Sequence, residues 1–268
     1  MALVSVIMAT YNIPDTQILR TAINSVLRQT FSNFELIICD DGSTNDTYEL
    51  LQEISRQDDR IILVRNQINM GAAVARNACI RLAGGKFIAI MDSDDFSAPC
   101  RLQKEVQFLI DFPEYDFVGV KGQYFNLWPY ENLGIYWFCQ RPREIDFLFT
   151  LPFVHASLMF RREALEAIGG YTEARVATRS EDYDLLMRLY AAGYRGANIP
   201  EVLYLIRLDD NTYKRRRYKY RFNECVVKYK GFKTLGLMPR GLVYALKPLI
   251  VGLIPVQLLR WMKLKYYK

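Results

Sequence analysis

The sequence predicts an α/β fold in which a mostly parallel sheet carries helices on both faces, with a helical extension at the C-terminus. Over the first 95 residues, short apolar runs typical of strands alternate with stretches whose apolar residues recur at helical spacing. Apolar residues make up 51% of the 268, which is enough for one sizeable core. Such an alternation is typical of a parallel sheet connected by right-handed crossovers.

The elements of the first half follow one another closely. Residues 15–29 place apolar side chains three and four apart, which indicates a helix. Ser43 or Thr44 is positioned to cap the second helix, and Gly84-Gly85 ends the third. In chain order we expect a strand over 4–9, a helix over 15–29, a strand over 36–39, a helix over 46–56, a strand over 61–64, a helix over 72–83 and a strand over 88–91.

The second half is more mixed. It predicts a helix over 99–112, a strand over 117–120, an aromatic-rich loop over 121–140, a strand over 157–160, helices over 162–168 and 181–192, and a strand over 202–206. The five cysteines are scattered and show no CxxC spacing, so we expect reduced thiols in a cytosolic setting. Because residues 3–9 already have the pattern of a core strand, we do not expect an export signal.

Two of the predicted strands end in carboxylates. The strand over 88–91 leads into Asp92-Ser93-Asp94-Asp95, and the strand over 36–39 leads into Asp40-Asp41. An isolated Asp-x-Asp is usually a solvated turn. Here both clusters follow strands of one parallel sheet, so we expect a single ligand cleft at its carboxyl edge. Carboxylates this close need a compensating cation, and oxygen ligands favour Mg²⁺ or Mn²⁺.

Four segments carry a family resemblance when they are taken in order: residues 5–12, Asp40-Asp41-Gly42-Ser43, residues 69–77 and Asp92-Ser93-Asp94-Asp95. Their order and spacing resemble the family 2 glycosyltransferases over roughly residues 3–100, and Glu181-Asp182 extends the match to about 205. The resemblance implies an inverting enzyme of the GT-A fold that uses nucleotide-diphosphate sugars. We therefore expect a catalytic domain over 1–206, with a nucleotide-sugar half over about 1–100 and an acceptor half over about 101–206.

The donor site is expected at the ends of the first, second and fourth strands. Tyr11 and Asn12 can meet a nucleobase with a ring and backbone groups. The resemblance implies that Asp41 accepts a hydrogen bond from the base and that Arg76 contacts the base or the diphosphate. Asp40 as a turn-former and Arg76 in a salt bridge with nearby acids are simpler alternatives. In full, we expect Thr10, Tyr11, Asn12, Asp41, Arg76, Asp92, Ser93 and Asp94 to bind the nucleotide sugar. The resemblance further implies that Asp94 and Asp95 bind the metal ion.

Inversion at the anomeric carbon needs a base on the acceptor side. Asp182 lies in the first turn of a predicted helix, where carboxylates are common for structural reasons alone. The resemblance implies that this Asp is the base. His155, the single histidine, is either a core residue or an acceptor contact, and the aromatic residues of 124–138 leave the same choice open. After the last strand many relatives have Arg-x-His, where this chain has Arg207-Leu208-Asp209; Asp209 is an alternative oxygen ligand.

The charge distribution divides the chain near Arg207. Residues 207–268 carry 16 Lys and Arg against three acidic residues, so this segment is strongly basic while the remainder is acidic. A basic segment calls for an anionic partner, either nucleic acid or a membrane surface. The apolar stretch 241–259, with basic and aromatic residues on both sides, favours a helix lying in the headgroup region over a nucleic-acid arm. A membrane-spanning helix, and packing on the catalytic domain or in a homodimer, remain alternatives.

These observations predict a metal-dependent inverting glycosyltransferase at the cytoplasmic face of the membrane. We expect a UDP-sugar donor and a saccharide acceptor that is linked to a lipid, as in the synthesis of surface polysaccharides. A nucleotidyltransferase is one rival, but it would need a basic glycine-rich loop where Thr10-Tyr11-Asn12-Ile13-Pro14 stands. A non-catalytic membrane scaffold that binds nucleotide sugars is another, although no acidic site residue is lost.

Overall fold

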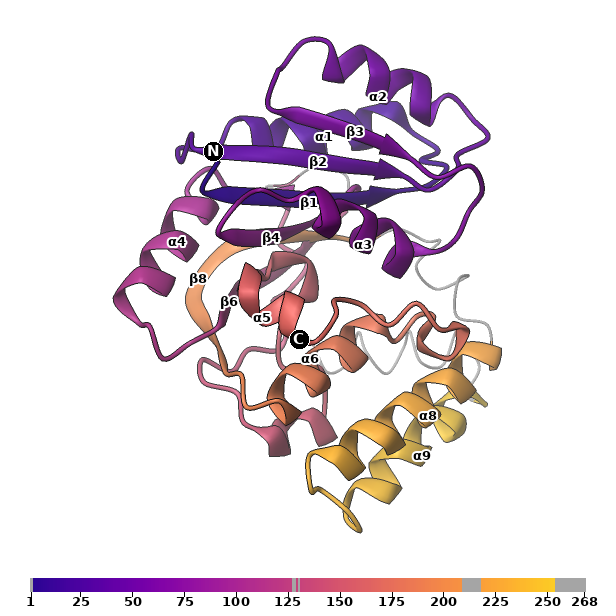
Figure 1. Cartoon of the computed structure of the whole chain (residues 1–268). Coiled ribbons are helices and arrows are strands. Elements are labelled where there is room, and N and C mark those ends of the chain that lie inside the picture. Colours follow the sequence, from indigo (N-terminus) through magenta and orange to yellow (C-terminus); the bar gives the residue numbers. More distant parts are fainter. Residues whose placement is uncertain (1, 127–128, 130, 209–217, 254–268) are drawn as a thin grey trace.

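The computed structural model of the chain describes residues 2–126, 129, 131–208 and 218–253. Its strands are β1 (Val4–Thr10), β2 (Phe34–Asp40), β3 (Ile61–Arg65), β4 (Phe87–Asp92), β5 (Phe96–Ser97), β6 (Phe117–Phe125), β7 (Met159–Arg161) and β8 (Gly196–Arg207). They form one eight-stranded sheet in the order β3-β2-β1-β4-β7-β6-β8-β5 (Figure 1). The predicted mixed α/β architecture is therefore confirmed.

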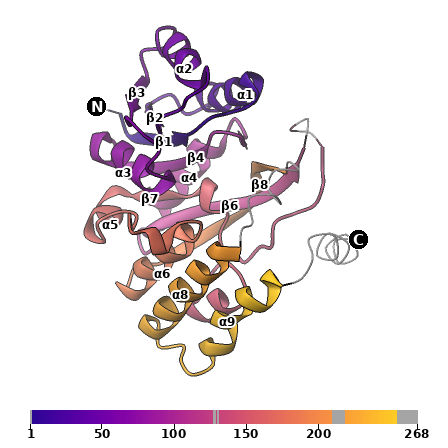
Figure 2. The same ribbon diagram turned by 90° about the vertical axis from the view of Figure 1, so that its right-hand side faces the viewer.

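The helices cover both faces of this sheet (Figures 1 and 2). They are α1 (Thr16–Leu27), α2 (Thr47–Ser55), α3 (Ala72–Leu82), α4 (Arg101–Asp111), α5 (Arg162–Ala167), α6 (Glu181–Ala191), α8 (Tyr218–Thr234) and α9 (Gly241–Gly252), with short 3-10 helices η1 (Glu144–Leu148), η2 (His155–Ser157) and η3 (Arg175–Ala177). The cap predicted for α2 was wrong. The helix starts after Asp46 without a side-chain cap, because the Ser43 hydroxyl instead accepts from the backbone N–H of Asn12.

The first four strands are parallel and in register at their carboxyl ends. Ala9 of β1 lies opposite Cys39 of β2 and Asp92 of β4, and Thr10 lies opposite Asp40. The acidic residues that follow β2 and β4 therefore meet at one edge of the sheet, beside the end of β1. This register is what brings the site together.

The remaining strands depart from a simple parallel order. β7 runs antiparallel to both β4 and β6, and β5 runs antiparallel to β8. Residues 121–125, which we expected to begin a loop, continue β6 as far as Phe125 because the long strand β8 pairs with them throughout. That expectation was wrong for the first five residues of the range. β6 and β8 are parallel to each other, and the long connection between them carries β7, α5 and α6.

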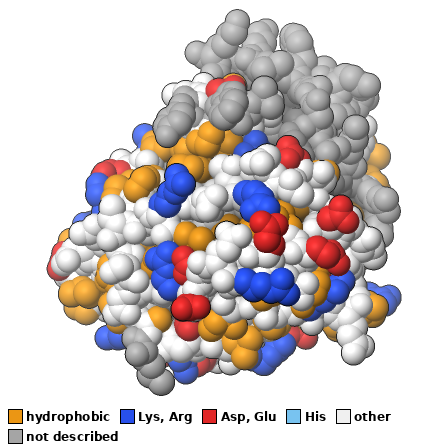
Figure 3. Space-filling model, turned by 90° about the horizontal axis from the view of Figure 1, so that it is seen from above, with side chains coloured by type: hydrophobic (Ala, Val, Ile, Leu, Met, Phe, Trp, Pro, Cys, Tyr) orange, Lys and Arg blue, Asp and Glu red, His pale blue; other side chains and the backbone are white. Residues whose placement is uncertain are grey.

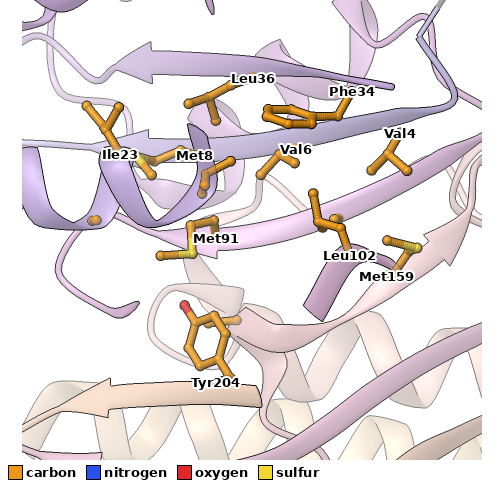
Figure 4. Close-up of a cluster of buried hydrophobic side chains, with 14 of the residues drawn as sticks. Val4, Val6, Met8, Ile23, Phe34, Leu36, Met91, Leu102, Met159 and Tyr204 are labelled. Atoms are coloured by element: carbon orange, nitrogen blue, oxygen red, sulfur yellow. The ribbon is translucent and has the colours of Figure 1, made fainter. Parts of the chain in front are cut away.

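Side chains at alternate positions of each strand point to opposite faces of the sheet and pack into two hydrophobic cores. Val4, Val6 and Met8 of β1 pack beneath α1, α2 and α4, whereas Ile7 points to the opposite core with α3, α5 and α6. Figure 4 shows the first of these cores, to which Met91 of β4 and Tyr204 of β8 also contribute their side chains. Alternation of this kind follows from the two-residue period of a strand.

The C-terminal helices α8 and α9 lie side by side and pack on the rest of the chain (Figures 1 and 2). Phe232 of α8 is fully buried in the hydrophobic core that also contains the apolar side chains of α6. A Cβ at Gly231 of α8 would collide with the side chain of Met187, which belongs to α6. None of the helices in the described ranges is long and apolar enough to cross a lipid bilayer. The end of the predicted apolar stretch, from residue 254 onward, lies outside the described residues, and the boundary near Arg207 stays a prediction.

Surface charge is mixed where it can be followed. On the face in Figure 3, Lys and Arg side chains of the described residues alternate with Asp and Glu side chains and with small apolar areas. A surface of this kind projects little net field over the distance that salt allows.

Candidate functional site

A cavity of about 880 Å³ opens at the carboxyl edge of β1, β2 and β4. Its walls come from both halves of the chain: the loop after β1, the loop before α3, the turn after β4, η2, the segment leading into α6, the end of β8 and the start of α8. Of the predicted site residues, it is lined by Thr10, Tyr11, Asn12, Asp41, Arg76, Asp92, Ser93, Asp94, Asp95 and Asp182. The tertiary structure therefore brings the full predicted set to one cavity.

The loop after β1 is tied to the loop after β2. The backbone N–H of Asn12 donates to the Ser43 hydroxyl at 2.9 Å, and the side-chain oxygen of Asn12 accepts from the N–H of Thr44 at 2.8 Å. Asn12 adopts a positive φ of 46°, which Asn tolerates better than most residues. This bend leaves Tyr11 partly exposed in the cavity wall, where its ring is accessible to a flat ligand.

Asp41 organises the loop before α3. Its carboxylate accepts hydrogen bonds from the Asn66 side chain at 2.8 Å and from the N–H groups of Met70 and Gly71 at 3.0 and 2.7 Å. Gly71 takes a φ of 97°, a region that a Cβ disfavours. Asp41 is 2% exposed, so its first function in this structure is to hold that loop against β2. A contact with a base would add to these bonds.

Asp40 is the structural member of the pair. It is fully buried, its carboxylate accepts from the N–H of Ser43 at 3.1 Å, and it lies 3.2 Å from the Arg65 guanidinium. These contacts match the turn-forming role that was one of the two alternatives for this residue.

The acidic turn after β4 contains two kinds of carboxylate. Asp95 is 5% exposed and accepts from the backbone N–H of Arg207 at 2.8 Å. Burial, followed by the charges of Asp94 and Asp92, raises the pKa of Asp95 well above its usual range. Asp94 lies in the cavity wall, and its carbonyl accepts from the Arg207 side chain at 2.8 Å. Because neighbouring like charges disfavour ionisation, Asp95 tends to keep its proton in this turn unless a cation is present.

This donor set fits an ion that is shared with a substrate. No group of three His, Cys, Asp or Glu side chains in the described ranges could hold a metal by itself. Mg²⁺ and Mn²⁺ commonly use one or two carboxylates together with substrate phosphates and water, rather than an all-protein cage. Asp94, and Asp95 behind it, supply hard oxygen ligands of the right type. Asp209, considered as a further ligand, lies outside the described residues.

Arg76 joins the two sides of the cavity. It is 8% exposed, and its guanidinium lies 2.8 Å from Asp92 and 3.6 Å from Glu181. The ring of Tyr171 lies 5.6 Å from the guanidinium carbon. The ion pair with nearby acids, one of the two alternatives for Arg76, is therefore present, and it connects β4 with the start of α6. Its Nε has no partner in the described part of the chain.

Asp182 stands in the first turn of α6, in the wall of the cavity. Burial raises its pKa to about 7, and the charge of Glu181 adds to this. The N–H of Tyr183, which donates to Asp182 at 2.8 Å, and the charge of Arg76 act in the opposite direction. A carboxylate with a pKa near neutrality exchanges protons readily at physiological pH, which is what a general base requires.

His155 is a neutral residue in the wall of the cavity. Its Nε2 lies 2.8 Å from the hydroxyl of Tyr171. Burial and then the charge of Arg76 lower the pKa of His155 to about 3, so the ring carries no charge at neutral pH. Sequence reasoning missed Tyr171, which contacts both His155 and Arg76. The signal available was the preceding Gly169-Gly170, because both glycines take a positive φ and turn the chain there.

Asn77 is a second residue that sequence reasoning left without a role. Its side-chain amide donates to the carbonyl of Tyr171 and accepts from the N–H of the same residue, both at 2.9 Å. Asn77, which follows Arg76 in α3, therefore holds the backbone of Tyr171 against this helix. A third such residue is Tyr220 of α8, which lines the cavity although it belongs to the basic C-terminal segment.

Comparison with known proteins identifies the family. The model for glycosyl transferase family 2 matches residues 5–169. The chain is 35% identical to Bacillus subtilis EpsE, which is named as a glycosyltransferase, over 99% of this chain and 93% of EpsE. It is 29% identical to Escherichia coli WfaP, named as a UDP-Glc:α-D-GlcNAc-diphosphoundecaprenol β-1,3-glucosyltransferase, over 88% of each chain.

Solved structures have the same fold. Residues 1–349 of Staphylococcus aureus TarS in complex with UDP superpose with a TM-score of 0.68 at 18% identity, covering 96% of this chain and 76% of TarS 1–349. The mannosyltransferase PcManGT of Pyrobaculum calidifontis, in complex with GDP-Man and Mn²⁺, gives a TM-score of 0.62 at 20% identity, covering 99% of this chain and 81% of PcManGT. The chain is thus a glycosyltransferase with the GT-A fold, and it belongs to glycosyl transferase family 2.

Proposed function

We propose that the chain transfers a sugar from a UDP-sugar to a hydroxyl of a lipid-linked saccharide, with inversion at the anomeric carbon, in the synthesis of a surface polysaccharide. The observation that carries this proposal is the meeting of Asp182 with the residues around Asp92 and Asp94 in one cavity. The relative WfaP, by its name, uses UDP-Glc and a diphosphoundecaprenol-linked acceptor, which supports both substrate classes.

In the proposed reaction Asp182 accepts the proton of the acceptor hydroxyl. The hydroxyl oxygen forms a bond to the anomeric carbon while the bond from that carbon to the β-phosphate oxygen breaks. The electron pair of the broken bond leaves with UDP. Since the pKa of Asp182 is about 7, most of the enzyme holds this group ionised at pH 8. Activity should therefore rise with pH through neutrality.

The donor is held by the opposite wall. Tyr11 presents a ring, and Asp41, already bonded to the Met70 and Gly71 N–H groups, presents carboxylate oxygen to a base. Asp92, fixed by Arg76, is available to the ribose. A divalent ion bound by Asp94 and Asp95 would neutralise charge on the departing diphosphate.

The substitution Asp182→Asn tests the assignment. An amide cannot accept the proton, so turnover should fall by about 10²- to 10⁴-fold. UDP affinity, measured by calorimetry, should stay within about twofold, because Asp182 is on the acceptor side. Full turnover by the variant would exclude Asp182 as the base. A wild type that binds a UDP-sugar without transferring it would favour the non-catalytic scaffold.

We further propose that α9 attaches the enzyme to the cytoplasmic face of the membrane. One face of α9 packs on the protein through Gly241, Ala245 and Pro248. The opposite side carries apolar side chains that are 42–73% exposed: Leu242, Val243, Leu246, Ile250 and, just beyond, Leu253. An exposed apolar face in a basic segment is suited to an anionic headgroup region.

Vesicle flotation tests this attachment. Wild type should float with vesicles that contain anionic lipid, and Val243→Glu with Ile250→Glu should abolish flotation. Ile110→Glu on α4 is the control, because Ile110 is also well exposed, at 58% against 73% for Val243 and 66% for Ile250, but lies outside the C-terminal segment. Equal flotation of both variants would contradict the proposal.

A further inference from the structure

Arg179 is a cation in the cavity wall that the reaction described above does not use. It lies in the segment between η3 and α6, three residues before Asp182, and its side chain is exposed. Its backbone takes a φ of 68°, the left-handed conformation that residues with a Cβ seldom adopt. Conformations of this kind cluster where the surrounding structure holds a side chain for a ligand.

Within the part of the chain that the structure describes, the Arg179 side chain is unpaired, in contrast to Arg76 and Arg207 of the same wall. Arg76 is paired with Asp92 and Glu181, and Arg207 donates to the carbonyl of Asp94. No hydrogen bond or ion pair joins the Arg179 side chain to another residue in the described ranges. A guanidinium in a ligand cavity without a protein partner is available for a planar, two-point contact with an anion.

The position of Arg179 near Asp182 indicates which anion it binds. Three residues of chain span at most about 10 Å, so Arg179 and the base Asp182 belong to the same end of the cavity. The acceptor hydroxyl must reach Asp182. If the acceptor sugar carries a phosphate on its own anomeric carbon, that phosphate lies about one sugar ring away from the reacting hydroxyl, on the acceptor side. The donor diphosphate belongs to the opposite side, at Asp94.

We propose that Arg179 binds the phosphate of the acceptor and thereby selects saccharides that are linked to a lipid through a diphosphate. This inference rests on the proposed function, since it assigns a recognition residue to the acceptor half of that site. It predicts that the enzyme distinguishes a glycosyl diphosphate from a neutral glycoside that carries the same sugar and the same lipid chain.

Two synthetic acceptors test the inference directly: undecyl α-N-acetylglucosaminyl diphosphate and undecyl α-N-acetylglucosaminide. With wild type, the diphosphate should have the lower KM. Arg179→Gln should raise the KM for the diphosphate by about 10- to 100-fold, the usual effect of losing a charge-assisted hydrogen bond, and should change the KM for the neutral glycoside by less than about twofold. Arg179→Lys should retain part of the preference, because the charge remains.

Arg175→Gln is the matched control. Arg175 lies on the same segment, is also exposed and does not line the cavity, so its replacement should leave both KM values unchanged. An equal effect of Arg179→Gln on the two acceptors would overturn the inference. A raised KM for the UDP-sugar would also overturn it, because it would place Arg179 on the donor diphosphate. Transfer by wild type to both acceptors with equal KM would refute the role of Arg179 alone, whereas transfer to neither would refute the proposed function as well.

Discussion

Replacing the proposed base should stabilise the folded protein while it lowers turnover. The pKa of Asp182 is raised from 3.8 to about 7, chiefly by burial and then by the charge of Glu181. The folded state therefore holds this proton more tightly than the unfolded state does. Between about pH 4 and pH 7 folding takes up a proton at this site, so its contribution to stability is present at low pH and is lost as the pH rises.

The size of the effect follows from the shift. About three pKa units at 1.36 kcal/mol each set a ceiling of about 4 kcal/mol at pH 8. Because water reaches the partly exposed carboxylate, we expect about 1–2 kcal/mol. Asp182→Asn removes the charge but keeps an oxygen for the Tyr183 N–H. The variant should thus melt above wild type at pH 8, by about 2–4 °C for each kcal/mol.

Thermal unfolding of both proteins at pH 5 and pH 8 is the assay, and the gap should be larger at pH 8. Asp184→Asn is the matched control on the same helix. Asp184 accepts from the Thr172 hydroxyl at 2.6 Å and the Arg188 guanidinium at 2.8 Å, so its loss should destabilise the fold by about 1–3 kcal/mol. The reasoning fails if Asp182→Asn melts below wild type at pH 8, or if the gap does not depend on pH.

Three further substitutions test other parts of the structure. Asp94→Ala should abolish the Mn²⁺-dependent part of UDP binding in calorimetry, and wild-type binding that is unaffected by Mn²⁺ would contradict the metal assignment. Gly170→Ala should cost about 1–3 kcal/mol in chemical unfolding and reduce turnover, because a Cβ there lies 2.7 Å from the Asn77 side-chain oxygen at a φ of 68°; unchanged stability would refute this. Gly231→Leu should cost about 1–3 kcal/mol, because its Cβ would overlap the end of the Met187 side chain and lie 3.2 Å from the Met187 Cβ, so the larger side chain must enter the contact between α8 and α6; an unchanged melting temperature would show that α8 is not tightly docked.

Local pattern was sufficient for the first half of the fold. The strand periods, the helical spacing of residues 15–29 and the Gly84-Gly85 stop predicted β1 to β4 and α1 to α3 to within a few residues. These signals are local, because a strand repeats every two residues and a helix every 3.6. The acidic residues after β2 and β4 could likewise be placed at one edge, since parallel strands end on the same side.

Local pattern did not reveal strand direction. The sequences of β6 and β7 resemble any buried strand, and nothing in their two-residue period states whether a neighbour runs parallel or antiparallel. The extension of β6 to Phe125 depends on β8, which lies about 80 residues later in the chain. The packing of α8 against α6 could not be predicted for the same reason. The need for a glycine at position 231 becomes clear only when Met187 is seen beside it.

By itself the sequence determined which chemical groups this enzyme has: carboxylates at strand ends, a basic C-terminal segment and an Asp at the start of α6. Only the tertiary structure decided what those groups can do. It placed Arg76 between Asp92 and Glu181, set the pKa of Asp182 near 7 and left Arg179 without a partner among the described residues. The physical reason is that burial and charge interactions depend on distances between residues far apart in the chain, which folding alone creates.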